Sequence, residues 1–189
     1  MNEPSLGTTP FHLSDAKQFF ELSKDIDIRK EFPYMRFENI DDAKQYIEHQ
    51  MQIKETSRTA FFKAIRIIFG KDTGNYTDKN SILIGFISLH KSGAFETMLA
   101  GGFKETLSYA IISNFRNKGL MTLALNMTLG AMKVDEYNLV ATIVKPHNAP
   151  SIRVLEKCGF DLVTENVITS FFVKRITMNE IEYKQIFNL

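Results

Sequence analysis

The fold is decided by residues 105–160, which read ETLSYAIISNFRNKGLMTLALNMTLGAMKVDEYNLVATIVKPHNAPSIRVLEKCGF. Residues 105–112 predict a strand and 113–118 a polar turn. From 119 to about 134 the apolar side chains recur at helical spacing, which predicts a helix. A second strand is expected over 139–144, followed by a short helix that begins at Asn148 and is closed by Gly159.

The connection from the first strand to the helix predicts an anion-binding site. A sharp strand-to-helix turn directs several free backbone N–H groups into one small volume, and the helix dipole adds partial positive charge there. Gly119 lets a ligand approach the backbone closely because it has no Cβ. Arg116 and Lys118 can add side-chain charge. Phosphate is the anion that such a site most naturally binds.

Three motifs stand out in this stretch. They are Tyr109-x-Ile111, then Arg116-Asn117-Lys118-Gly119-Leu120-Met121, then Asn148-x-x-Ser151 running into Glu156-Lys157-Cys158-Gly159-Phe160. The middle motif alone is weak, but it becomes strong with a strand before it and the third motif one strand and one helix later. Together they resemble the GNAT acyltransferase superfamily, and within it the ribosomal-protein N-terminal acetyltransferases of the Rim type.

The bulk composition agrees with one globular domain over residues 1–189, because 44% of the residues are hydrophobic. With 23 basic and 22 acidic residues, the chain has no large field to hold nucleic acid or an anionic membrane. Its single cysteine, Cys158, excludes an internal disulfide, and no Cys/His spacing suits a metal such as zinc. The first residues lack a signal-peptide pattern, so we expect a cytoplasmic protein.

The resemblance implies an α/β (α+β) fold. This is a GNAT-like mixed, mostly antiparallel six- to seven-stranded sheet with a splayed central parallel pair and helices on both faces. Before the central stretch we expect an amphipathic helix capped by Ser14, and a second one, after Pro33, capped by Asn39 or Asp41. A brief edge strand could end at residues 11–13.

Further strands are expected over 60–69 and 82–89, and Lys63 and Arg66 suggest partial exposure of the first. Residues 160–165 and 167–174 predict an antiparallel pair around Asn166. The tail could form a helix capped by Asn179 that docks on the body or on a second copy, so a homodimer stays open.

The resemblance implies acetyl-CoA as donor and no metal. The turn would supply N–H groups to the pyrophosphate, and the pantetheine arm would pair with the ends of two splayed parallel strands, over 109–113 and 140–144. The residues assigned to the donor in this way are Ile111, Ile112, Ser113, Arg116, Asn117, Lys118, Gly119, Leu120, Met121, Thr122 and Asn148.

Acyl transfer to an amine needs a proton for the departing thiolate and an oxyanion donor, for which the N–H near Ile111 is implied. Many relatives place a Tyr where this chain has Leu155, so the commonest acid is missing. Ser151 is the candidate substitute, and its alternative is a plain polar residue of the first helical turn. Cys158 and Gly159 are interpreted as packing and helix-capping residues.

The general base is open at this point. An α-amine with a pKa of about 7.8 is partly neutral at pH 7 and needs only a modest base, unlike a lysine at about 10.4. Relatives often carry Glu at the position of Thr106, and Glu105 lies one residue earlier. Since a one-residue shift reverses the strand face, Glu105 acts only if a bulge intervenes, and otherwise is a solvated charge. His90 and His147 are the other candidates.

These features favour an acetyl-CoA-dependent N-acetyltransferase that acts on a primary amine, either a protein N-terminal α-amine or a small molecule. The alternative from another class is a non-catalytic acyl-CoA-binding sensor or interaction protein, which the missing Tyr and the displaced Glu keep open. A nucleotide-binding module of unrelated fold ranks third, since the turn has neither a Gly-x-Gly-x-x-Gly nor a Gly-Lys-Ser/Thr loop. No motif identifies the acceptor.

Overall fold

The structure is a computed structural model that describes residues 3–56, 60–72, 74–91, 105–132 and 139–176, together with Glu180 and Lys184. The chain forms two compact units. The first holds residues 1–88 and 109–127, and the second holds 89–108 and 128–189. Between the strands predicted over 82–89 and 105–112, residues 92–104 lie outside the described residues, as does the tail helix apart from those two single residues.

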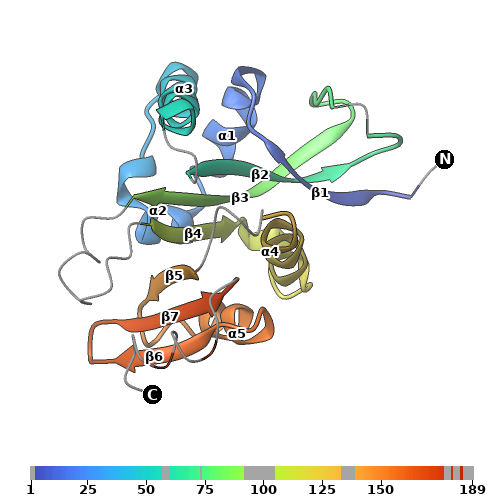
Figure 1. The fold of residues 1–189 in the computed structure, drawn as a ribbon. Coiled ribbons are helices and arrows are strands. Elements are labelled where there is room, and N and C mark those ends of the chain that lie inside the picture. The colour runs from blue at the N-terminus through green and yellow to red at the C-terminus, as the bar shows by residue number, and fades with distance from the viewer. Residues whose placement is uncertain are drawn as a thin grey trace. The chain divides into compact units, whose positions relative to one another are not determined.

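Seven strands form one mixed, mostly antiparallel sheet in the order β1-β2-β3-β4-β5-β7-β6 (Figure 1). They are β1 (Ser5–Pro10), β2 (Phe61–Ile68), β3 (Ser81–Lys91), β4 (Glu105–Ile111), β5 (Leu139–Val144), β6 (Asp161–Glu165) and β7 (Ser170–Arg175). β4 and β5 are the parallel pair, with Thr106 opposite Ala141. The predicted fold class is confirmed, while the splay of the parallel pair stays a prediction.

The helices are α1 (Ala16–Leu22), α2 (Ile26–Glu31), α3 (Ile40–Thr56), α4 (Leu120–Gly130) and α5 (Ala149–Lys157). Short 3-10 turns are η1 (Leu13–Asp15), η2 (Pro33–Met35) and η3 (Ser113–Phe115). Of the two caps proposed for α3, Asn39 is the one found, because its Oδ1 accepts the Asp42 N–H at 3.0 Å. In contrast, α2 was not predicted.

Three boundaries predicted from the sequence are wrong. β1 ends at Pro10, because Phe11 turns into the core, where it is 3% exposed. Ser14 is not a cap, since it lies inside η1, and the carboxylate of Asp15 accepts the His12 N–H instead, at 2.8 Å. The helix expected to reach about 134 ends at Gly130.

An aromatic cluster joins α1 and α3 to the sheet in the first unit. Phe11 stacks on Phe62 with ring centroids 4.2 Å apart, and Phe19 meets both rings edge-on. Phe19 of α1 is fully buried and Tyr46 of α3 lies against it. Offset and edge-to-face rings of this kind add to the stabilisation from buried area. In Figure 1 both helices lie on the same side of β1 and β2.

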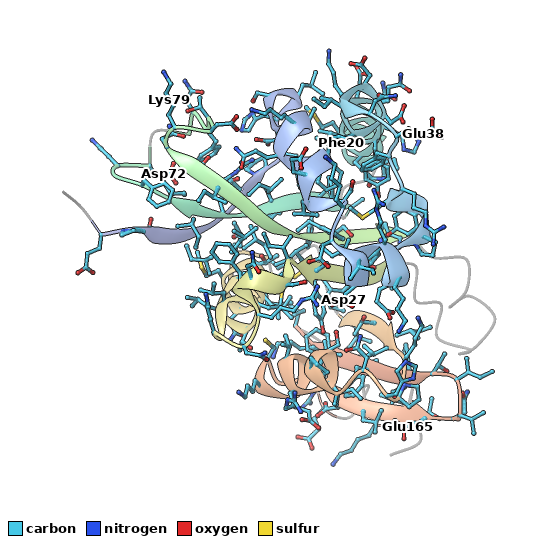
Figure 2. All side chains as sticks on the ribbon, turned by 180° about the vertical axis from the view of Figure 1, so that it is seen from behind. Phe20, Asp27, Glu38, Asp72, Lys79 and Glu165 are labelled. Atoms are coloured by element: carbon cyan, nitrogen blue, oxygen red, sulfur yellow. The ribbon has the colours of Figure 1, made fainter. Side chains whose placement is uncertain are left out.

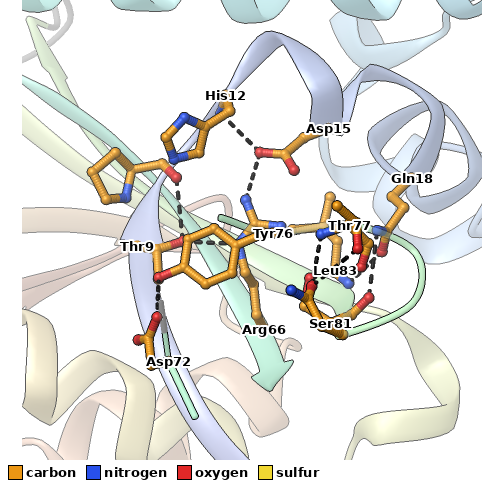
Figure 3. Close-up of polar contacts among 12 residues, drawn as sticks. Thr9, His12, Asp15, Gln18, Arg66, Asp72, Tyr76, Thr77, Ser81 and Leu83 are labelled. Atoms are coloured by element: carbon orange, nitrogen blue, oxygen red, sulfur yellow. Dashed lines mark hydrogen bonds and ion pairs between the residues drawn. The ribbon is translucent and has the colours of Figure 1, made fainter. Parts of the chain in front are cut away.

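Arg66 of β2 is fully buried, so the expectation that it marks an exposed strand is wrong. Figure 3 shows why: its guanidinium donates to Thr9 Oγ1 at 2.8 Å and pairs with the carboxylate of Asp15. The guanidinium also lies over the Tyr76 ring, 4.5 Å from the centroid, and Tyr76 donates to Asp72 at 2.9 Å. A charge can be buried here because another charge and an aromatic face replace its water.

The second unit is built on β5, β7 and β6, which pair antiparallel, and on α5. Asn166 makes the predicted turn between β6 and β7, its Oδ1 accepting the N–H groups of Ile168 and Thr169 at 2.8 and 2.9 Å. Gly159 follows α5 with φ of 74°, as expected for a residue that ends a helix. Among the described residues, no helix is long and apolar enough to cross a membrane.

We expect Asp15→Ala to lower the free energy of unfolding by about 3–5 kcal/mol, because it leaves the buried guanidinium of Arg66 without a counter-charge. Urea denaturation of the purified protein measures this difference. The matched control is Asp78→Ala, which removes an exposed ion pair with Lys17 and should leave stability nearly unchanged. Equal effects of the two substitutions would contradict the structural role given to the buried pair.

Candidate functional site

The connection between β4 and α4 has the shape that the sequence predicted. β4 ends at Ile111, η3 follows, and the chain then takes positive φ at Asn117 (60°) and Gly119 (73°) before α4 begins at Leu120. A Cβ placed on Gly119 would meet no atom within 4 Å, so the space beside it is open. Glycine is the residue that reaches this conformation at least cost, and it leaves the backbone accessible.

Five consecutive backbone N–H groups at this point have no acceptor among the described residues. Within the part of the chain that the structure describes, the amides of residues 117–121 donate to no protein acceptor. The amides on either side are used: Arg116 N–H donates to Ser113 O at 3.2 Å and Leu123 N–H to Gly119 O at 3.0 Å. Because the first amides of a helix have no partner within it, and the dipole makes them positive, they can bind an anion.

Ile112 and Ser113, both assigned to the donor, have their amides committed to the protein. Ile112 N–H donates to Ile84 O of β3 at 2.9 Å, which continues the sheet past the end of β4. Ser113 N–H donates to the carboxylate of Asp25 at 2.7 Å, and the Ser113 hydroxyl donates to the same oxygen at 2.6 Å. The amides of residues 117–121 follow directly after these committed donors and Arg116.

Arg116 directs its donors to the protein as well. Its Nε donates to Ile111 O at 2.9 Å, and Nη2 lies 3.1 Å from Asp25 Oδ1. Nη1 pairs with the carboxylate of Asp27, which Figure 2 labels on α2. The guanidinium thus links the end of β4 to the start of α2, and two carboxylates offset its charge.

Asp25 is the residue of this region that the sequence prediction missed. It caps α2 by accepting the N–H groups of Asp27 and Ile28 at 3.1 and 3.2 Å. Burial raises its pKa, but hydrogen bonds from the Ser113 hydroxyl and amide and from Ile28 N–H, with the charge of Arg116, outweigh burial. The pKa of Asp25 therefore lies below its ordinary value. The pattern of Asp25 and Asp27 ahead of Arg29 and Lys30 is a helix signal that could have revealed α2.

The remaining residues of the turn differ in their exposure to solvent. Lys118 is exposed, and its ammonium donates to Asn114 O at 3.0 Å and lies 5.3 Å from the Phe115 ring centroid. Met121 is 7% exposed and packs inward, while Leu120 and Thr122 are half-buried. At Leu120 and Met121 the turn therefore offers backbone more than side chain.

A hollow of about 610 Å³, which no sequence pattern predicts, lies in the first unit beside the turn. Its walls come from α1, from the start of β3 and from residues 112–114. Leu22, Leu83 and Ile112 supply apolar surface, while Lys17 and Asp78 pair with each other on its wall. The lining is Lys17, Gln18, Glu21, Leu22, Asp25, Ile26, Asp78, Ser81, Ile82, Leu83, Ile112, Ser113 and Asn114.

The second unit holds the remaining candidate residues. Asn148 caps α5, its Oδ1 accepting the Ser151 N–H at 3.2 Å, and Ser151 is half-buried on the first turn. Leu155, where relatives carry Tyr, is fully buried. The described part of the chain offers no hydrogen-bond partner to the buried Thr106 Oγ1. Glu105 belongs to β4, but its side chain lies outside what the structure describes.

Two histidines complete the set. His90 in β3 is half-buried, and burial lowers its pKa. A histidine with a lowered pKa is neutral at pH 7 and so is able to accept a proton. His147 is exposed ahead of α5. No group of three or more His, Cys, Asp or Glu residues that could hold a metal ion is found within the described ranges.

Comparisons with known proteins agree with this geometry. Residues 6–161 match the family described as Acetyltransferase (GNAT) domain, and the chain belongs to this family. No curated protein matches the chain. The match covers the whole β4-to-α4 connection and most of the sheet.

Solved structures share the fold at low sequence identity. The microcin C7 self-immunity acetyltransferase MccE, solved with acetyl-CoA and AMP, is 19% identical with a TM-score of 0.68, covering 93% of this chain and 94% of that one. A GNAT-family acetyltransferase from Bacillus anthracis is 20% identical with a TM-score of 0.66, covering 92% and 97%. RimL, a ribosomal L7/L12 α-N-protein acetyltransferase solved with coenzyme A, is 11% identical with a TM-score of 0.65, covering 93% and 96%.

The low pKa of Asp25 predicts how stability changes with pH. Because its pKa is lower in the folded than in the unfolded chain, Asp25 stabilises the fold above the ordinary value of 3.8, and this stabilisation is lost as the pH falls through the folded pKa. Wild type should therefore exceed Asp25→Asn in unfolding free energy by a margin that shrinks from about pH 5 to about pH 3. Urea denaturation across this range tests it, and a constant margin would contradict it.

Proposed function

We propose that this chain is an acetyl-CoA-dependent N-acetyltransferase that transfers the acetyl group directly to a primary amine. The observation that carries the proposal is the row of unpaired amides over residues 117–121, in a chain of the GNAT acetyltransferase family. The acceptor would be a protein N-terminal α-amine or a small amine. That RimL is among the structures of the same fold supports the first of these two classes.

The donor would be held mainly by backbone. The amides of residues 117–121 suit the pyrophosphate of coenzyme A, because they converge at a helix N-terminus and Gly119 leaves them open. Lys118 adds an exposed ammonium beside the same turn. Arg116, whose charge is already offset by carboxylates, would shape the turn instead of touching the donor.

The chemistry requires one attack and two proton movements. The neutral amine nitrogen attacks the thioester carbonyl carbon, the C–S bond breaks, the nitrogen loses a proton, and the coenzyme A thiolate gains one. Ser151, with its hydroxyl at the start of α5, would hydrogen-bond the departing sulfur. Because the thiolate is a good leaving group, one hydroxyl suffices. Glu105 and His90 are candidate acceptors for the amine proton.

The alternative function is a non-catalytic acyl-CoA-binding protein. Its support is that the position of the usual acid is Leu155, fully buried, and that Thr106 stands where relatives often carry Glu. Such a protein would keep the phosphate turn and lose the reaction. Binding and turnover therefore need to be measured separately.

We expect calorimetric titration to show binding of acetyl-CoA and coenzyme A, followed in the same sample by acceptor-dependent thiol release against N-terminal peptides and small amines. Gly119→Val should weaken coenzyme A binding at least about tenfold, since its side chain strains a positive φ and fills the space that the pyrophosphate needs. Gly130→Ala is the matched control, as a glycine of the same α4 whose Cβ also meets open space.

The outcomes separate the two functions. Binding with thiol release supports the transferase, and binding with no release on any acceptor supports the sensor. Absence of binding, or binding that Gly119→Val leaves intact, would overturn the assignment of the turn to the donor.

We also expect Ser151→Ala to lower kcat by about one hundredfold at saturating acetyl-CoA, because the thiolate then leaves without a hydrogen-bond donor. Steady-state thiol release measures this. Ser151→Thr, which keeps a hydroxyl, serves as the control and should retain most of the rate. An unchanged kcat in Ser151→Ala would show that Ser151 is a plain residue of the first turn.

A further inference from the structure

The carboxylate of Asp25 accepts hydrogen bonds both from the connection between β4 and α4 and from the start of α2. Its Oδ2 accepts both the N–H and the hydroxyl of Ser113, at 2.7 and 2.6 Å. Its Oδ1 accepts Asp27 N–H, Ile28 N–H and Arg116 Nη2, at 3.1, 3.2 and 3.1 Å. One side chain, 8% exposed, thereby receives five donors from two segments that are far apart in the sequence.

Arg116 connects Asp25 to the end of β4. Its Nε holds the Ile111 carbonyl at 2.9 Å while Nη2 holds Asp25. The strand end, Ser113 and the first turn of α2 are therefore tied at several points within the same unit. We call Asp25, Ser113 and Arg116 the α2 clamp.

The position of the clamp matters because the unpaired amides follow directly after it. Residue 117 comes next after Arg116, and the amides of 117–121 have no protein partner among the described residues to hold them. Backbone donors bind an anion well only when they are held in place beforehand, since ordering a free loop upon binding costs affinity. A residue that holds the turn in place is therefore expected to increase the affinity for the donor.

The negative charge of the carboxylates in this region would have the opposite effect on donor binding. Asp25 and Asp27 are two carboxylates close to a site for an anion, and by charge alone they would weaken phosphate binding. If Asp25 acted only through its charge, its removal would tighten binding of the donor. If it acts by holding Ser113 and Arg116, its removal weakens binding. The sign of the effect distinguishes the two.

We propose that Asp25 is a positioning residue for the acyl donor: through Ser113 and Arg116 it holds the β4-to-α4 connection in the shape that presents the amides of residues 117–121 to coenzyme A. The proposal rests on the proposed function and adds to it a residue of α2 outside the donor motif. In this proposal Arg116 likewise affects the donor by holding the turn in shape and not by contacting coenzyme A.

The test is Asp25→Asn, which has the same shape. Asparagine keeps an oxygen that can cap α2, because it is as good an N-cap as aspartate. The side-chain NH₂ group of asparagine then takes the place of Oδ2, which accepts from Ser113. Two hydrogen-bond donors, this NH₂ group and the Ser113 N–H, would face each other. We expect the Kd for coenzyme A, by calorimetry, to rise about tenfold. In turnover, KM for acetyl-CoA should rise by the same factor, with kcat changed less than about threefold.

The matched control is Asp27→Asn on the same helix. It removes the same charge and one bond to Arg116, but Asp27 is 56% exposed and makes no contact with Ser113. We expect coenzyme A to bind this variant at least as tightly as wild type. Hydrogen exchange of the ligand-free proteins gives a second readout, in which residues 112–119 should exchange faster in Asp25→Asn than in Asp27→Asn.

The outcomes are distinct. Tighter or equal binding by Asp25→Asn, while wild type binds coenzyme A, overturns this inference and leaves the proposed function standing. Equal weakening in both variants also overturns it, because a general effect on the start of α2, and not the contact with Ser113, would then explain the loss. Failure of wild type to bind coenzyme A overturns the proposed function and this inference with it.

A second variant covers the case in which Asp25→Asn does not fold. Ser113→Ala removes only the hydroxyl bond at 2.6 Å and leaves the Ser113 amide on Asp25. We expect it to raise the Kd for coenzyme A about two- to threefold. An unchanged Kd in a folded Ser113→Ala protein would then overturn the proposal.

Discussion

The central constraint is that the first N–H groups of α4 have no acceptor within the helix. A strand that turns directly into a helix leaves these donors just beyond the end of the strand. Among the described residues, the amides of 117–121 have no acceptor. A site built on backbone needs few particular side chains, only a positive φ that glycine supplies and an anion to bind. The donor region therefore needs a certain shape more than a certain composition.

The arginines of the first unit serve that shape. Arg66 is buried against Asp15, and Arg116 is paired with Asp25 and Asp27, so carboxylates offset the charge of both guanidinium groups. Positive charge holds β2 to η1 in one case and α2 to the end of β4 in the other. In the proposed function, amides and an exposed lysine would recognise the anion, which is consistent with a net charge of only +1.

The catalytic side is less defined than the donor side, for a physical reason. An amine with a pKa near neutrality needs little help to lose its proton, and a thiolate leaves readily, so no strong acid or base is required. In the proposed transferase, Leu155 could then stand where many relatives carry Tyr, as long as Ser151 or solvent supplied the proton.

The sequence alone determined the strand, turn and helix around Gly119 and the cap at Asn148, because periodicity, glycine at positive φ and capping are local properties. The mixed sheet was expected from the resemblance to the GNAT superfamily. It failed for Arg66, whose partner Asp15 lies 51 residues away, and for Asp25, whose partner Ser113 lies 88 residues away. A charged residue within a strand resembles an exposed one until the fold places a carboxylate beside it. Only the tertiary structure decided which charges are buried and what holds the turn, because such pairs form between segments that no local pattern connects.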